Sequence, residues 1–422
     1  MKKLSIFFIA VFLIFASLTS CKAKKSENSG KVKVICTIFP EYDWARSILG
    51  QTDQHTNLSL LVKSGVDLHN YQPSTADIVA ISTCDLFVYV GGESDAWVKD
   101  ALKNATNPNM KVLSLIEVLQ DRVKEEEVVE GMQIEEKDDD DDDCLSETEY
   151  DEHLWLSIKN AKKVCQAFTQ AICQLVPENA ETYQANLENY LLQLDNLDLT
   201  YAGVISASPN KTIIVCDRFP LCYLVEDYKL NYYAAFAGCS AETEASFETV
   251  AFLSNKLKEL KLPAVLVMDG SDQKIAKTVI LNAKLPKTDI FTIDSMQSTS
   301  LRQAFDGKNY ISVMQENLER LKKALKKKKK MAQLKCENLK LGYNSKVVAE
   351  NISFEVNKGD YLCIVGENGS GKSTLMKTLL HLIKPLSGTI ETGDGVLADE
   401  IGYLPQQTEV QRDFPASVKE IV

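Results

Sequence analysis

The sequence predicts an α/β protein of two lobes joined by a long helix, followed by a segment that carries a phosphate-binding motif. Three observations support this prediction. Short β-branched runs alternate with stretches of helical periodicity from residue 31 onward, which is typical of parallel sheets covered by helices. A long helical pattern begins at Pro177 and divides this alternation into two similar series. A G-x-x-x-x-G-K-S motif follows the second series near the C-terminus.

Length and composition are those of a multidomain globular protein. The chain has 422 residues, of which 45% are hydrophobic, and this length favours two or three domains. Its formal net charge of −12 argues against a nucleic-acid partner, which would require a basic face to neutralise phosphates. The same charge suits a protein that attracts cations.

Residues 1–21 predict an export signal. Lys2 and Lys3 precede an apolar run over 4–16 that is too short to span a bilayer comfortably, and small residues then lead to Cys21. This arrangement resembles a bacterial lipoprotein signal, which implies cleavage before Cys21 and lipidation of its sulfur. Residues 22–30 are expected to be a polar tether, so the folded body should lie at the extracytoplasmic face of the cell membrane.

The first lobe is predicted over residues 31–176. A candidate ligand, His69, follows its second predicted strand, where open α/β sheets place their ligand sites. The strands are expected at 31–38, 58–62 and 86–90, and the helices at 40–49, 75–81 and 159–175.

Residues 118–152 interrupt this alternation with an acidic loop. The glutamates at 125–127 and the aspartates at 138–143 repel one another, so we expect a mobile loop. Two interpretations stay open: a solubilising insertion, or a weak collector of divalent cations beside the site.

The joining helix is predicted over about 177–206 and the second lobe over about 207–328. A helical connection permits less opening of the cleft between the lobes than a flexible loop would. The second series has strands expected at 212–216, 231–235, 264–268 and 290–293, and helices at 221–227, 246–260, 273–285 and 310–325.

Two of the four histidines have the context of metal ligands. His153 lies in EYDEHLWLS, between carboxylates and a large apolar group, and His69 lies in the loop GVDLHNYQPS. The neutral imidazole is the commonest protein ligand for zinc and its neighbours. Taken singly, each histidine would more often be an ordinary polar loop residue than a ligand.

Three segments together carry a family resemblance. TIFPEYD at 37–43, GVDLHNYQPS at 65–74 and YDEHLWLS at 150–157 occur in the order found in the metal-binding lipoproteins of ABC importers. Residues 31–328 therefore resemble the zinc-type branch of that family. The resemblance implies a metal cleft between two α/β lobes, binding of Zn²⁺ or Mn²⁺, and delivery to a membrane permease powered by an ATPase. It implies no enzymatic activity for this part of the chain.

By position, the resemblance implies His69 and His153 as the first two ligands and Asp294 as a carboxylate ligand. The family's third ligand is a histidine in a His-Asp-x-Phe pattern, where this chain has CDRF at 216–219. A Cys216 thiolate would favour zinc over manganese. Alternatively Asp217 turns inward, water fills the position, or Cys216 is the buried end of a strand. Asp294 could instead be a helix cap.

The C-terminal segment contains the motif GENGSGKST at 366–374, between a predicted strand at 361–365 and a predicted helix at 375–382. Backbone N–H groups of such a loop enclose phosphate oxygens. Residues 331–422 resemble the first part of an ABC transporter ATPase, which adds an adenine-stacking aromatic and a Q-loop glutamine. The residues expected to contact ATP and Mg²⁺ are Tyr343, Gly366, Asn368, Gly369, Ser370, Gly371, Lys372, Ser373, Thr374 and Gln406.

We expect this segment to bind nucleotide poorly, because residues 331–422 show no signature motif, acidic magnesium-binding strand or switch histidine. An export signal and a cytoplasmic ATPase also conflict in compartment. Our hypothesis is that two neighbouring genes of one importer operon are read as one chain, with the lysine run at 326–330 as the slip point. Two alternative functions stay open: an ATP-binding transporter subunit, or an adhesin-like surface lipoprotein with a structural metal.

Overall fold

The computed structural model describes residues 30–62, 66, 68–133, 150–239, 244–326, 332–343, 346–393 and 401–402. The chain divides into two compact units, Met1–Lys327 and Lys328–Val422, which are described separately. The expected signal peptide with Cys21, the aspartate run at 138–143 and Gln406 lie outside the described residues. Among the helices that the structure describes, none combines the length and the apolar character that crossing a bilayer requires.

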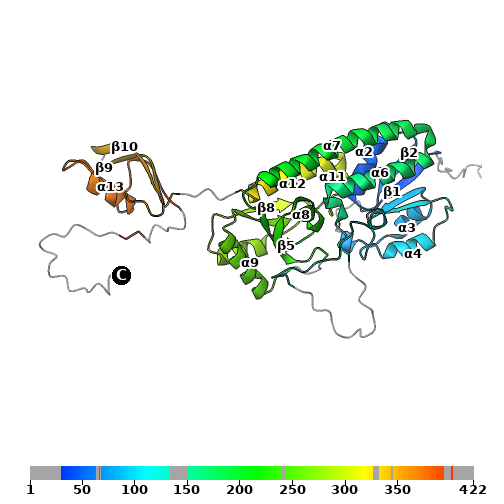
Figure 1. Ribbon diagram of the computed structural model, residues 1–422, viewed down its shortest axis with the longest axis horizontal. Coiled ribbons are helices and arrows are strands. Elements are labelled where there is room, and N and C mark those ends of the chain that lie inside the picture. The colour runs from blue at the N-terminus through cyan, green and yellow to red at the C-terminus, as the bar shows by residue number, and fades with distance from the viewer. Residues whose placement is uncertain are drawn as a thin grey trace, which may run out of the picture. The chain divides into compact units, whose positions relative to one another are not determined.

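The first lobe contains a four-stranded parallel sheet in the order β2-β1-β3-β4 (Figure 1). Side chains alternate between its two faces: Val34 and Cys36 face one apolar cluster, whereas Ile35 faces another. The strands are β1 (Val32–Cys36), β2 (Thr56–Leu60), β3 (Leu86–Tyr89) and β4 (Lys111–Ser114). The strand β4 was not expected from the sequence; it is short, and only Ser114 in it is buried.

Helices cover both faces of this sheet. Ser74 begins α3 and Ser157 begins α6, each accepting a hydrogen bond from a backbone N–H of the first turn. The helical elements of the lobe are α2 (Phe39–Leu49), η1 (Leu68–Asn70), α3 (Thr75–Ser82), α4 (Trp97–Lys103), α5 (Leu115–Val118), η2 (Leu154–Leu156) and α6 (Ile158–Leu175).

The joining helix, α7 (Ala180–Ala207), follows the short helix η3 (Pro177–Asn179) and runs along both lobes (Figure 1). At 28 residues it extends about 42 Å. Its buried side chains recur every three or four residues, which places them on one stripe of the helix. They are Tyr183, Leu187, Tyr190, Leu194, Leu197, Tyr201 and Ile205.

The second lobe repeats the topology of the first, with strand order β6-β5-β7-β8 and parallel pairing throughout. Its strands are β5 (Thr212–Arg218), β6 (Asn231–Phe236), β7 (Ala264–Met268) and β8 (Asp289–Ile293). Its helices are α8 (Cys222–Tyr228), α9 (Phe247–Leu260), α10 (Lys274–Asn282), α11 (Leu301–Phe305) and α12 (Tyr310–Ala324).

One apolar cluster runs through both lobes. It contains Val34 and Leu86 of the first sheet, Ile213 and Leu266 of the second, and the buried stripe of α7. Hydrogen bonds between distant segments add to it: Trp155 Nε1 donates to the Ser295 carbonyl at 2.8 Å. The two lobes therefore share one core.

The first part of the predicted acidic loop packs against the second lobe. Arg122 donates to Asp227 at 2.8 Å, and the Gln133 N–H donates to the Ala235 carbonyl at 3.0 Å. The expectation of a mobile loop over the whole of 118–152 is therefore wrong for residues 118–133, which are held by apolar contacts and hydrogen bonds. The run of like charges predicted repulsion within the segment, but it gave no information about hydrogen-bond partners in the second lobe.

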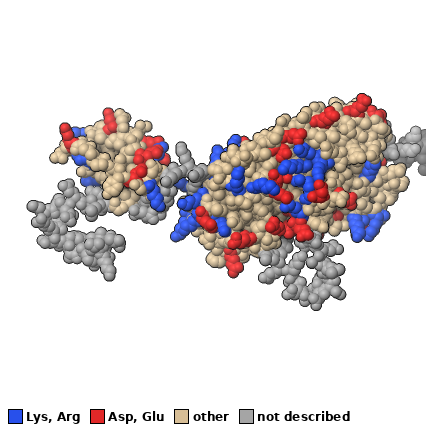
Figure 2. All heavy atoms as spheres, in the orientation of Figure 1, with Lys and Arg blue, Asp and Glu red and all other residues tan. Residues whose placement is uncertain are grey.

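Figure 2 shows acidic and basic side chains intermixed over the middle of the face in view.

The unit Lys328–Val422 contains an antiparallel sheet in the order β10-β9-β11. Its elements are β9 (Leu334–Tyr343), β10 (Lys346–Val356), α13 (Lys372–Leu379) and β11 (Ser387–Thr392). The buried strand predicted at 361–365 is not formed: Val365 is 86% exposed, and no strand pairs with this segment in the described part of the unit.

Candidate metal centre

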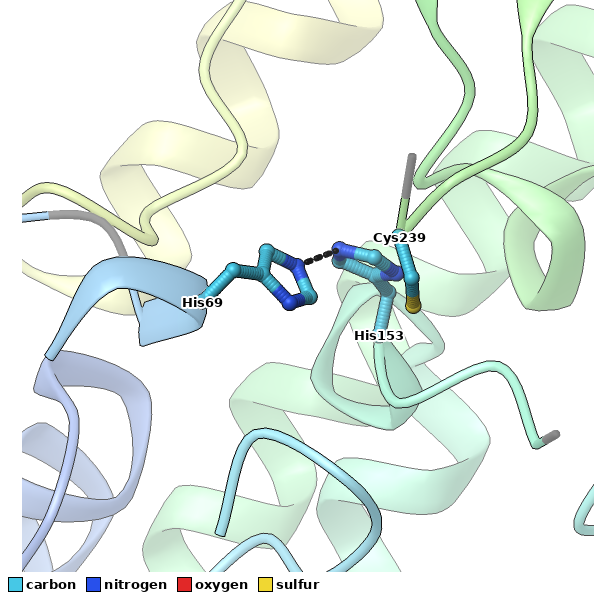
Figure 3. A group of neighbouring side chains, drawn as sticks. All are labelled: His69, His153 and Cys239. Atoms are coloured by element: carbon cyan, nitrogen blue, oxygen red, sulfur yellow. Dashed lines mark hydrogen bonds between the residues drawn. The ribbon is translucent and has the colours of Figure 1, made fainter. Parts of the chain in front are cut away.

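His69 and His153 lie side by side between the lobes (Figure 3). Their Nε2 atoms are 3.4 Å apart, although 84 positions separate the residues in the sequence. His69 belongs to η1, in the loop that follows β2, and His153 precedes η2. The loop after β2 leaves the carboxyl edge of the first sheet, the usual position of ligand sites in open parallel sheets.

His153 is fully buried and its orientation is fixed by Asp151. The Asp151 Oδ1 atom accepts from the backbone N–H of His153 at 2.8 Å and lies 3.0 Å from its Nδ1. The Trp155 ring lies 5.3 Å away, centroid to centroid. A carboxylate on Nδ1 places the hydrogen there and leaves the lone pair of Nε2 toward the cleft, as in many metal-binding histidines.

His69 has a comparable arrangement. Its Nδ1 lies 2.6 Å from the Ser94 hydroxyl, and the Ser94 N–H donates to Glu152 Oε1 at 2.8 Å. The other carboxylate oxygen of Glu152 is buried, has no hydrogen-bond partner among the described residues, and lies 3.9 Å from His69 Nδ1. Both rings therefore present Nε2 toward each other while Nδ1 faces a polar partner.

Cys239 is the third potential ligand in this group. One ligand atom each of His69, His153 and Cys239 lies within 4.8 Å of the others. Cys239 follows β6, and its backbone N–H donates to Glu126 Oε1 at 2.6 Å. Cys239 was not expected as a ligand from the sequence; its position three residues after a strand of the second lobe was the available signal.

Cys216 and Asp294 lie apart from this group. Strand alternation places Cys216 with Ile214 in the apolar cluster beneath α9 and α10, which matches the alternative of a buried strand end. Asp294 forms an ion pair with Lys308 at 2.6 Å and accepts from the Met296 N–H. Asp217, the alternative to Cys216, accepts from the Met268 N–H and so links β5 to β7. The predicted four-ligand set is therefore not assembled; the structure brings together only its two histidines.

Gln297 is a further residue at the centre that the sequence did not indicate. It lies in the turn after β8, is 7% exposed, and its amide nitrogen lies 3.0 Å from His69 Nε2 and 2.9 Å from His153 Nε2. His69 and His153 come from the first lobe, whereas Cys239 and Gln297 come from the second. The centre therefore requires both lobes.

Carboxyl groups with restricted access to solvent lie close to the two histidines and Cys239. Burial raises the pKa of Glu126 and of Glu152 above the usual range. Burial also raises the pKa of the Cys239 thiol, and the nearby Glu126, Asp151 and Glu152 raise it further. A dication held here would act in the opposite direction, because its positive charge stabilises a thiolate.

Two imidazoles and one thiol form a donor set suited to zinc. Zn²⁺ binds nitrogen and sulfur ligands in tetrahedral sites, whereas Mn²⁺ and Mg²⁺ prefer oxygen. Ligand atoms of His69, His153 and Cys239 lie within 4.8 Å of one another, and the Asp151 carboxylate orients the His153 imidazole. We therefore consider this group the candidate metal centre.

The phosphate-binding loop lies in the other unit. Lys372 Nζ donates to the carbonyl oxygens of Gly366 and Glu367, at 2.7 Å each. The lysine side chain therefore folds back onto the backbone of its own loop. Gly369 and Gly371 have positive φ angles of 86° and 95°, which glycine adopts readily. Tyr343, the predicted adenine-stacking residue, is 46% exposed at the end of β9.

Comparison with known protein families gives two matches. Residues 34–324 match the family described as zinc-uptake complex component A, periplasmic. Residues 349–419 match the ABC transporter family.

Individual relatives agree with the first match. The chain is 28% identical over 322 residues to the zinc-binding lipoprotein AdcA of Streptococcus pneumoniae, covering 76% of this chain and 61% of AdcA. It is 28% identical over 318 residues to the high-affinity zinc uptake system protein ZnuA of Bacillus subtilis, covering 75% of this chain and 95% of that protein. The chain thus spans about three fifths of the length of the AdcA proteins that it matches.

Solved structures show the same fold. The Zn(II)-bound ZnuA-like domain of Streptococcus pneumoniae AdcA superimposes with a TM-score of 0.55 at 25% identity, covering 71% of this chain and all of that domain. The metal-dependent lipoprotein YcdH of Bacillus subtilis superimposes with a TM-score of 0.56 at 24% identity, covering 70% of this chain and 99% of that one.

Proposed function

Because the chain belongs, over residues 34–324, to the family of periplasmic zinc-uptake components, we propose that it binds Zn²⁺ between its lobes and delivers the ion to an ABC permease for uptake. Zinc is the cargo in this proposal. The permease and its ATPase are the partners, and the binding lobes act outside the cytoplasm, anchored to the membrane through lipidated Cys21.

The convergence of two imidazoles carries the proposal. Two Nε2 atoms from separate loops lie 3.4 Å apart at a largely buried position where both lobes meet. Such a pair has little value for packing, since each ring requires polar partners to be satisfied there. A shared dication satisfies both lone pairs at once.

We propose His69, His153 and Cys239 as protein ligands of the ion. Cys239 supplies the donor from the second lobe that the resemblance had assigned to Cys216. With a thiolate ligand the centre should prefer zinc to manganese. Ligands must lose their protons to bind, so zinc affinity should fall as the pH is lowered.

Zinc titration of the metal-free full chain tests this function. We expect one tightly bound Zn²⁺ per chain, and replacement of either His69 or His153 by alanine should weaken binding by more than roughly 100-fold, because a lost ligand costs more than a lost outer partner. Absence of one-to-one binding, or unchanged binding after both replacements, would contradict the proposal.

A cobalt-substituted sample tests the thiolate ligand. Co²⁺ bound to a thiolate gives a near-ultraviolet charge-transfer band, which Cys239→Ser should remove. Cys216→Ala is the matched control, because Cys216 lies in an apolar cluster away from the histidines. Loss of the band in the control but not in Cys239→Ser would instead identify Cys216 as the ligand.

Nucleotide binding by the second unit is an additional candidate function, supported by the family match at 349–419 and by the closed lysine loop. Titration with a fluorescent ATP analogue would test it. We expect weak binding that Lys372→Ala abolishes; binding that Lys372→Ala leaves unchanged would not involve the loop.

A further inference from the structure

The side chain of Gln297 fills the point that the two imidazoles share. Its amide nitrogen lies 3.0 Å from Nε2 of His69 and 2.9 Å from Nε2 of His153. Because the two Nε2 atoms are only 3.4 Å apart, one NH₂ group reaches both, with one hydrogen directed to each. A cation shared by the two lone pairs would have to occupy the same place.

The partners of the opposite ring nitrogens decide which way the amide faces. If both rings are neutral and the amide oxygen faces them, both Nε2 atoms carry hydrogens, and Nδ1 of His153 directs a lone pair at the Asp151 carboxylate 3.0 Å away. That contact would be repulsive. With the NH₂ group facing the rings, both Nε2 atoms accept and both Nδ1–H groups donate, one to Asp151 and one to Ser94. This assignment gives each of the four ring nitrogens a hydrogen-bond partner.

The turn that carries Gln297 is fixed on both sides. Asp269 Oδ1 accepts from the N–H and the hydroxyl of Ser295, at 2.7 and 2.8 Å, and Asp269 Oδ2 accepts from the Ser298 hydroxyl at 3.1 Å. Between them Met296 is fully buried with a φ angle of +64°, which a residue with a side chain rarely adopts. The turn therefore holds Gln297 in one position, and the unfavourable φ angle of Met296 costs some conformational energy.

We propose that Gln297 is an internal latch of the metal centre. In the metal-free protein its NH₂ group takes the place of the cation and holds both rings in the tautomer that a metal requires. When Zn²⁺ enters, the amide rotates or withdraws. This inference rests on the proposed function, and it adds that hydrogen bonds from the second lobe join both histidines of the first before an ion enters.

The latch has a consequence for affinity. Entry of Zn²⁺ breaks two amide hydrogen bonds, whereas Asp151 and Ser94 continue to orient the rings through Nδ1. A variant without the amide should therefore bind zinc more tightly, by about tenfold, because each such hydrogen bond has a modest net value. A ligand role for Gln297 predicts the opposite change.

Histidine tautomers in the metal-free full chain provide the first test. The chain has only four histidines, so ¹⁵N-histidine labelling gives a simple spectrum, and the signals are assigned by their loss in His69→Ala and His153→Ala. We expect both rings to have an unprotonated Nε2 and a protonated Nδ1. A hydrogen on Nε2 of either ring in the metal-free protein would overturn the latch.

Zinc affinity of Gln297 variants, measured by competition with a chromophoric chelator, is the second test. Gln297→Leu removes the donor at similar volume, Gln297→Ala removes it with less bulk, and both should bind zinc more tightly than the unmodified chain. Gln193→Leu, at an exposed position of α7, is the control and should not change affinity. Thermal unfolding followed by circular dichroism identifies any variant that fails to fold.

The outcomes separate the two proposals. Equal or weaker zinc binding by a folded Gln297→Leu or Gln297→Ala protein would overturn the latch while leaving the zinc function intact. If the unmodified chain and all variants fail to bind zinc, the proposed function is wrong. The claim that Gln297 occupies the position of a zinc ion is then wrong as well. The tautomer measurement needs no metal, so it still shows which way the amide faces.

Discussion

At the scale of single residues, each imidazole of the centre has one nitrogen engaged by its own lobe and the other directed at the cleft. Asp151 holds His153, and Ser94 holds His69. Neutral imidazole with the hydrogen on Nδ1 is the form that binds a metal through Nε2. The orientation of both rings in the candidate centre therefore depends on Asp151 and Ser94, which engage Nδ1 rather than Nε2.

Glu41, in α2, is a buried acid whose titration should affect stability. Its Oε2 accepts from the N–H and the hydroxyl of Thr37, whereas its Oε1 has no hydrogen-bond partner among the described residues. Burial, followed by the charge of Asp95, raises the pKa of Glu41 to about 8. The folded protein thus retains this proton over a range in which the unfolded chain has lost it, so the contribution to stability is largest below the ordinary carboxyl pKa and is lost as the pH rises through about 8.

We expect Glu41→Gln to reduce the loss of stability between about pH 5 and pH 8, and to be more stable than the unmodified chain at pH 8. Urea unfolding midpoints of the metal-free protein at several pH values would measure this. Glu188→Gln, at an exposed position of α7, is the control. Parallel pH profiles for Glu41→Gln and the unmodified chain would show that Glu41 does not cause the loss of stability at higher pH.

Gly238 allows the close approach of the second lobe to His153. A Cβ atom there would lie 2.9 Å from the Phe219 carbonyl oxygen and 3.2 Å from both Nδ1 of His153 and Oδ2 of Asp151. Gly238→Ala should displace the His153–Asp151 pair and weaken zinc binding by roughly tenfold, the lower end for loss of an outer partner. Calorimetric titration would measure the change. Unaltered affinity in the folded variant would show that the loop carrying Gly238 moves to accommodate the Cβ atom, and that the His153–Asp151 pair is not displaced.

At the scale of elements, α7 makes the two lobes one structure. Its seven buried side chains are spaced by three or four residues, and the cluster they join includes strands from both sheets. A helix of this length is stabilised mainly by the packing of such a stripe rather than by its intrinsic propensity. Its exposed face is therefore the place where propensity can be improved without disturbing contacts.

Gly203→Ala tests this interpretation of α7. Gly203 lies inside the helix on an exposed position, and a Cβ atom there would meet no other atom within 4 Å. We expect the variant to be more stable by about 1 kcal/mol, the usual difference between alanine and glycine in a helix. Its zinc affinity should equal that of the unmodified chain, which makes it a matched control for Gly238→Ala. A lower urea midpoint would indicate that helix packing, not propensity, dominates at this position.

At the scale of the whole molecule, the candidate metal centre and the phosphate-binding loop belong to different compact units. A ligand stabilises the unit that binds it by mass action, by about 2.7 kcal/mol at a hundredfold excess over its dissociation constant. We expect Zn²⁺ to raise the unfolding temperature of the unit Met1–Lys327 by roughly 5 °C or more under such conditions.

Differential scanning calorimetry would measure this shift. His153→Ala should abolish it, whereas Lys372→Ala, in the other unit, should leave it unchanged. An equal shift in His153→Ala would place the stabilising zinc at another site.

The sequence by itself determined the α/β class, the two series of elements, the long joining helix and the two histidines, because these depend on local periodicity, on turn residues and on motifs whose order is visible along the chain. Most predicted strands and helices begin and end within two or three residues of those observed. The short elements β4 and α4 were missed because they have few buried residues to give a pattern.

Only the tertiary structure decided which residues surround the two histidines. Cys216 lies at the end of a strand and matches a family ligand by position, yet alternation along β5 directs it into an apolar cluster. Cys239 and Gln297 carry no motif, and loops of the second lobe bring them to the centre. The physical reason is that a ligand set is a property of distances between loops far apart in the chain, whereas sequence patterns report only which face of its own strand or helix a residue occupies.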